Sequence, residues 1–191
     1  MKVIAFNGSP RKNGNTYGSL KIVLRQLEQE GMDTEMIQLG GKKLSGCIAC
    51  GRCSKNQDQR CAITDDDMNI FIAKMIEADG ILIGSPVYFG NVSTEVKALI
   101  DRSGYVSVAN GGLFKRKAGA AVVAARRAGT NFTYAAINFF FGINQMIVPN
   151  SNYWNMTLSR DIGDLEKDEE GKRTFEVLGQ NMAWLLKKTG V

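Results

Sequence analysis

The sequence predicts an α/β protein built on a parallel sheet with helices on both faces. Short apolar runs with the length of buried strands alternate along the chain with longer segments that have the period of amphipathic helices. The runs contain no polar alternation, which is typical of strands covered on both faces. Five such runs, with polar loops after the first four, favour a doubly wound five-stranded sheet whose ligands bind beyond the carboxyl ends of the strands.

The first half of the chain supplies two strands, one helix and a long loop. We expect strands over Lys2–Phe6 and Thr34–Leu39. Between them, Thr16–Glu30 has the apolar spacing of an amphipathic helix, at Leu20, Val23, Leu24 and Leu27. The segment Gly40–Thr64 is polar and has no clear period. A loop of this length inside one domain usually carries function.

The second half continues the alternation. Acidic residues at Asp65–Asp67 suit the first turn of a helix, because that end of the helix dipole is positive. The further elements that we expect are a strand over Gly80–Gly84, a helix from Ser93 or Thr94 through Ile100, a strand over Ala118–Ala125, a helix to about Phe141, a strand around Gln145–Val148 and a helix from about Asp164 to Lys188.

The cysteines form the most distinctive motif. All four of them lie in one short segment, and the chain contains no histidine. The C-x₂-C-x₂-C spacing of Cys47, Cys50 and Cys53, with Cys61 close behind, resembles that of [4Fe–4S] proteins. Structural zinc more often uses two C-x₂-C pairs that are farther apart. Iron–sulfur ligation, zinc binding and redox-active thiols without a metal therefore remain open from the residues alone.

Composition and charge restrict the function classes. Without histidine, neither a Ser/His/Asp nor a Cys/His catalytic set can form. The net charge of +5 lies entirely within residues 1–62, where it suits anionic ligands, and no basic helix indicates nucleic-acid binding. The longest apolar runs are shorter than the ~20 residues of a membrane span. We expect a cytoplasmic protein. The cytoplasm is reducing, so clustered cysteines are seldom disulfide-bonded there.

The loop Gly8–Thr16 joins the first strand to the first helix and is rich in hydrogen-bond donors. It offers hydroxyls, side-chain amides, an arginine and backbone N–H groups at a helix N-terminus, all of which suit a phosphate. It matches neither the Walker pattern nor the dinucleotide G-x-G-x-x-G pattern. A solvated turn that caps the helix is the alternative interpretation.

Three motifs resemble one family. Gly8–Arg11 with Asn15-Thr16 resembles the FMN-phosphate loop of the flavodoxin-like NAD(P)H-dependent FMN reductases, and Pro86–Ser93 is similar to their second flavin loop. The cysteine motif with Asp65–Met68 behind it is similar to the iron–sulfur flavoproteins of anaerobic archaea and bacteria, one branch of that family. The resemblance covers residues 1 to about 150.

The resemblance implies a flavodoxin-like FMN-binding domain over residues 1–150, with an iron–sulfur loop at 45–64. Residues 151–191 would form an extension and helix that pack on the same domain or at a subunit interface. It implies cofactor contacts in three loops and a set of cluster ligands. These are Ser9, Arg11, Asn13, Asn15 and Thr16 at the phosphate, Pro86, Val87, Tyr88, Phe89, Gly90 and Asn91 along the ribityl chain and ring, Arg126, Arg127 and Gly129 at the far side, and Cys47, Cys50, Cys53 and Cys61 on the cluster.

The expected function is that of an oxidoreductase that moves electrons between FMN and a [4Fe–4S] cluster. The cofactors carry the chemistry, so we expect no catalytic side chain. NAD(P)H or reduced ferredoxin would be the donor, a small molecule or protein the acceptor, and a homodimer or homotetramer the assembly, with neither nucleic acid nor membrane as partner. The alternatives are an NAD(P)H-dependent FMN or quinone reductase without a cluster and a zinc-stabilised flavodoxin-like protein without enzymatic activity.

Overall fold

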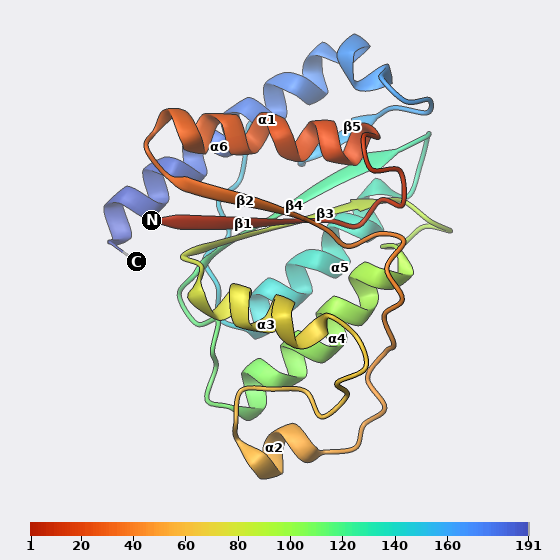
Figure 1. The fold of residues 1–191 in the computed structure, drawn as a ribbon. Helices are drawn as coiled ribbons and strands as arrows, with labels where there is room; N and C mark the ends of the chain where they lie inside the picture. Colours follow the sequence, from red (N-terminus) through yellow and green to blue (C-terminus); the bar gives the residue numbers. More distant parts are fainter. Residues whose placement is uncertain (191) are drawn as a thin grey trace.

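The computed structural model describes residues 1–190 and has one five-stranded sheet between two layers of helices (Figure 1). All strand pairs are parallel, and the order is β2-β1-β3-β4-β5. The strands are β1 (Lys2–Asn7), β2 (Asp33–Gln38), β3 (Gly80–Pro86), β4 (Ala118–Ala125) and β5 (Met156–Leu158). This is the flavodoxin-like order, so the predicted fold class is confirmed.

The helices divide between the two faces of the sheet (Figure 1). α1 (Asn15–Gln29) and α6 (Glu169–Thr189) cover one face, and α3 (Met68–Glu77), α4 (Thr94–Ala109) and α5 (Thr130–Ile143) cover the other. The short helix α2 (Arg52–Asn56) lies in the segment 45–66, which contains the four cysteines and is called the cysteine segment below. The 3₁₀ turn η1 (Asp164–Lys167) precedes α6. Among the described residues, no helix is long and apolar enough to cross a membrane.

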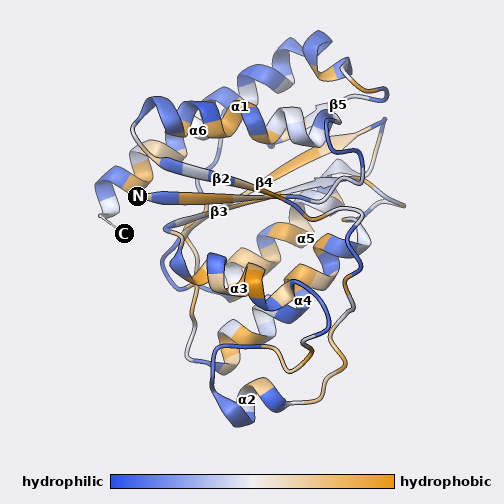
Figure 2. Cartoon of the chain, viewed as in Figure 1, coloured by the Kyte–Doolittle hydropathy of each residue, from blue (hydrophilic) through white to orange (hydrophobic). Residues whose placement is uncertain are grey.

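The apolar pattern explains the two layers. The helices turn their apolar sides toward the sheet and their polar sides toward solvent (Figure 2). In α1 the buried apolar residues are those of the predicted stripe, namely Leu20, Val23, Leu24 and Leu27. Strand β4 is small and fully buried, and a Cβ on Gly119 would lie 2.7 Å from the Phe141 ring. Small residues in this strand therefore let α5 pack close to the sheet.

The fifth strand lies later in the chain than predicted. The segment Gln145–Val148 forms only an isolated bridge, in which Ile147 pairs with Ala118 at the start of β4. Pro149 follows it and has no N–H to donate to a strand ladder. The chain then leaves the sheet and returns as β5, which pairs with Val123–Ala125 at the other end of β4. The placement of the fifth strand at Gln145–Val148 was therefore wrong.

The C-terminal helix packs on the same sheet as the N-terminal one. Its buried residues join those of α1 in a single apolar cluster, which includes Phe175, Leu178, Met182 and Leu186. α6 thus belongs to this core, and β5 adds an edge strand to the same sheet. The division of the chain into two regions at residue 150 stays a prediction.

Replacing Phe175 by alanine should destabilise the whole chain. The Phe175 side chain is fully buried, and truncating such a residue costs about 3–5 kcal/mol of unfolding free energy. Trp184→Ala on the same helix is the control, because Trp184 is 62% exposed and should cost little. Urea unfolding followed by circular dichroism measures both. An unchanged unfolding midpoint for Phe175→Ala would show that α6 is not part of the cooperative core.

Candidate functional site

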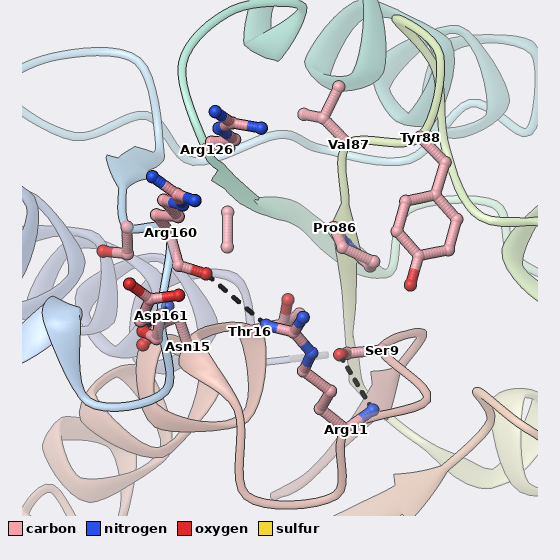
Figure 3. A pocket seen from close by; sticks show the side chains of 12 residues that line it. Ser9, Arg11, Asn15, Thr16, Pro86, Val87, Tyr88, Arg126, Arg160 and Asp161 are labelled. Atoms are coloured by element: carbon pink, nitrogen blue, oxygen red, sulfur yellow. Dashed lines mark hydrogen bonds between the residues drawn. The ribbon is translucent and has the colours of Figure 1, made fainter.

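A cavity of about 360 Å³ lies at the carboxyl ends of the strands, where the predicted cofactor loops meet (Figure 3). Its volume is in the usual range of small-molecule sites. Four loops contribute to its wall: those after β1, β3, β4 and β5. Ligands of doubly wound sheets bind at this edge.

The loop after β1 brings hydroxyl groups and the N-terminus of α1 to the cavity. Ser9 and Thr16 line the cavity although they are almost fully buried, and the Ser9 hydroxyl accepts a hydrogen bond from the Arg11 backbone N–H at 3.2 Å. The N-cap residue of α1 is Gly14, which has no side chain with which to cap the helix. The first N–H groups of a helix have no partner within it, and they carry the positive end of its dipole. A phosphate in this loop would accept hydrogen bonds from them.

Asn15 lines the cavity, but its side chain is bonded to the C-terminal part of the chain. Its Nδ2 donates to the Asp161 carbonyl at 2.8 Å, and its Oδ1 accepts from the backbone N–H groups of Gly163 and Leu165 at 3.2 and 3.4 Å. Asn15 therefore holds the loop after β5 in place. Asn13 is exposed and is not among the residues that line the cavity.

The loop after β3 is a tight turn that places one aromatic side chain, Tyr88, in the wall of the cavity. Tyr88 and Asn91 exchange two backbone hydrogen bonds, of 2.9 and 3.0 Å, around Phe89 and Gly90. Both central residues have positive φ, +47° and +79°, as in a tight two-residue hairpin turn. Tyr88 lines the cavity together with Pro86 and Val87, whereas the Phe89 side chain is fully exposed.

The loop after β4 packs against this hairpin. Gly129 has a φ of +90°, and a Cβ there would lie 2.8 Å from Val87 Cγ1 and 3.0 Å from Gly90 Cα. Glycine therefore permits the close approach of the two loops. Arg126 lines the cavity, whereas Arg127 is exposed and lies outside its lining.

A fourth loop, after β5, was absent from the sequence-based prediction. Ser159, Arg160 and Asp161 line the cavity, and the Arg160 carbonyl accepts a hydrogen bond from Arg11 Nη1 at 3.4 Å, drawn in Figure 3. The misplaced fifth strand hid this loop, because its position follows from the strand end. Arg11, Arg126 and Arg160 together give the wall a positive charge that suits a phosphorylated ligand.

The four cysteines line one small cavity of about 20 Å³, beside α2 and α4. All four are free thiols; Cys53 is buried, Cys61 is half-buried, and Cys47 and Cys50 are exposed. Burial, with smaller contributions from the neighbouring Cys61 and Cys50, raises the pKa of the Cys53 thiol above its ordinary value. Within residues 1–190, no group of three or more His, Cys, Asp or Glu side chains is arranged to hold a metal ion.

The donor set fits an iron–sulfur cluster. Thiolates are the ligands that such clusters use, and each of four cysteines binds a separate iron, so the sulfurs need not converge on one atom. The cysteine cavity has no lining residue in common with the cavity at the strand ends. The chain therefore carries two separate candidate sites.

The strand order and the cavity at the strand ends are those of a flavodoxin-like protein. Residues 1–161 match the model of the NADPH-dependent FMN reductase family, and the chain belongs to this family. It is 39% identical over 194 residues to an iron-sulfur flavoprotein of Methanocaldococcus jannaschii, with 98% of each chain covered. An iron-sulfur flavoprotein of Methanosarcina thermophila is 34% identical over 186 residues, which cover 93% of this chain and 95% of that one.

A solved structure of low sequence identity shares the fold. A WrbA-like flavodoxin from Agrobacterium tumefaciens superposes with a TM-score of 0.68 at 14% identity, over 98% of this chain and 97% of that one. The predicted family, its iron–sulfur flavoprotein branch and the oxidoreductase class are confirmed.

Proposed function

We propose that this protein is a redox flavoprotein that moves electrons between FMN and a [4Fe–4S] cluster. One observation carries the proposal: a single chain holds a phosphate-suited cavity at the strand ends and a second cavity lined by all four of its cysteines. The names of the relatives from M. jannaschii and M. thermophila support the same pairing of cofactors.

The chain's own residues would bind and orient FMN. Ser9, Thr16 and the uncapped N-terminus of α1 would donate hydrogen bonds to the phosphate, and Arg11 would neutralise part of its charge. Pro86 to Tyr88 would flank the ribityl chain and ring, with Arg126 at the far side. The other residues predicted to contact FMN belong to the same three loops, and we propose the predicted contacts for them as well. These are Asn13 at the phosphate, Phe89, Gly90 and Asn91 along the ribityl chain and ring, and Arg127 and Gly129 at the far side.

The two cofactors would divide the electron chemistry. Bound FMN can exchange electrons in pairs or singly, and a bound cluster exchanges them singly. Cys47, Cys50, Cys53 and Cys61 would hold the cluster, and the residues around each cofactor would set its potential through hydrogen bonds, burial and charge. NAD(P)H or reduced ferredoxin would supply the electrons, and a small molecule or a second protein would accept them.

We propose that the protein is cytoplasmic and forms a homodimer or homotetramer, and the surface of α5 supports the self-association. Phe132, Phe139 and Ile143 are 73%, 76% and 72% exposed, and their spacing places them on one side of this helix. Exposed apolar patches on soluble proteins mark interaction sites.

Anaerobic mixing of the flavin-loaded protein with NADH or NADPH tests the nicotinamide-linked part of the proposal. We expect at least one of them to bleach the flavin absorbance, because the flavin would accept a hydride. Dithionite is the control that shows the flavin to be reducible. Bleaching by dithionite and by reduced ferredoxin, but by neither nicotinamide, would identify an electron carrier fed by another protein.

A further inference from the structure

Helix α4 carries a buried arginine that binds the cysteine segment. Arg102 is 1% exposed and is among the largest fully buried side chains of the described residues. It lines the cavity that the four cysteines share. A buried charge is costly unless it is paired and its hydrogen bonds are satisfied.

Within residues 1–190, the hydrogen bonds of the Arg102 guanidinium all reach the segment from residue 45 to residue 66. Nε donates to Cys61 Sγ at 3.3 Å, Nη1 to the Ser45 carbonyl at 3.2 Å, and Nη2 to the Ile63 carbonyl at 3.0 Å. Nη1 also forms an ion pair with Asp66, whose side chain is 4% exposed. The planar fork of arginine permits this set of contacts, which a lysine could not make.

Asp66 is held in the charged state. Its burial opposes ionisation, but hydrogen bonds from Arg102 and from the backbone N–H groups of Met68 and Ser45 outweigh burial and lower the pKa of the carboxyl. The carboxylate offsets part of the positive charge that Arg102 places beside Cys61.

We propose that Arg102 is the positioning residue of the cluster: it fixes Cys61 as a ligand and raises the reduction potential of the cluster through the Nε–H···Sγ hydrogen bond. The inference rests on the proposed function, because it requires a cluster on the cysteines. Reduction adds one electron to an anionic centre, and a hydrogen bond or a nearby cation stabilises the added charge. Asp66 moderates this effect.

The test compares the midpoint potential of the cluster in three variants and in the wild-type protein. Each protein is loaded with iron and sulfide, and a redox titration followed by EPR measures the potential. Arg102→Gln should lower the midpoint potential by ~59 mV, which corresponds to a tenfold change in the equilibrium constant of a one-electron reduction. Asp66→Asn should shift it up, because Arg102 is then unpaired. Lys97→Ala is the control: Lys97 lies on the same helix and pairs with Asp101 at 2.6 Å, but both side chains are exposed.

A lower midpoint potential in Arg102→Gln and a higher one in Asp66→Asn would not result from a purely structural role of Arg102. Full iron content with an unchanged potential in Arg102→Gln would overturn the inference and leave the proposed function standing. If Arg102→Gln binds no iron, the midpoint potential of Asp66→Asn is the deciding measurement. A potential of Asp66→Asn at or below the wild-type value would overturn the inference. Wild-type protein that takes up no iron would overturn both, and metal analysis identifies that case.

The iron-free protein gives a second readout. Arg102 ties Ser45, Cys61 and Ile63 to α4 without any metal. Amide hydrogen exchange across residues 45–64 should therefore be faster in iron-free Arg102→Gln than in the iron-free wild type, and unchanged in Lys97→Ala. Equal exchange in Arg102→Gln and the wild type would contradict the positioning role.

Discussion

Replacing Cys50 by serine should remove the iron from the protein and leave the flavin bound. A [4Fe–4S] cluster uses four cysteine thiolates, and the chain contains only four cysteines, so none can replace the lost ligand. Serine offers a harder and more basic oxygen, which suits these irons less well than a thiolate. We expect iron and sulfide to fall from about four per chain to trace levels.

The flavin should remain because the two cavities have no lining residue in common. Ser54→Ala is a matched control, since Ser54 lies on α2 beside Cys53 and is exposed. Iron and sulfide analysis together with the flavin absorbance measures both outcomes. Equal iron in Cys50→Ser and the wild-type protein would remove Cys50 from the ligand set.

Replacing Arg11 by alanine should weaken FMN binding far more than riboflavin binding. Only FMN carries the phosphate, and a hydrogen bond to a charged partner contributes about 1.5–3 kcal/mol, or roughly a 10- to 100-fold change in affinity. Arg11 lines the cavity and contacts the Arg160 carbonyl, so its side chain lies at the proposed phosphate loop.

Lys12→Ala is the control for Arg11→Ala, because Lys12 is the next cation in the loop and does not line the cavity. Changing Asn15 at the same time would confuse the result, since Asn15 holds the loop after β5. Fluorescence titration of the iron-free, flavin-free protein gives both affinities. An equal loss for FMN and riboflavin would place the phosphate elsewhere.

The sequence was sufficient for the four long strands, but not for the fifth. Strands β1, β3 and β4 are continuous buried runs, which the apolar pattern shows directly. β5 has only three residues and only Thr157 is buried, so it has no pattern of its own. The segment Gln145–Val148 is more apolar than β5, so the pattern favoured it as the fifth strand. In the structure that segment forms only one bridge to the sheet.

The candidate site was predictable where one loop carries the signal and not where distant segments meet. The loops after β1, β3 and β4 follow strand ends that the pattern located, and all three line the cavity. The bonds of Asn15 span about 150 residues of sequence, so no local motif reveals them. Likewise, we expected a helix only through Ile100, whereas α4 continues to Ala109 and includes Arg102.

The first measurement to make is an absorption spectrum of protein purified without oxygen, combined with iron, sulfide, zinc and FMN analysis of the same sample. We expect flavin bands over a broad iron–sulfur shoulder, with one FMN and about four irons and four sulfides per chain. Flavin without iron, even after reconstitution with iron and sulfide, would contradict the proposed pairing of cofactors and indicate a reductase without a cluster. A colourless protein with stoichiometric zinc would contradict the flavin assignment as well.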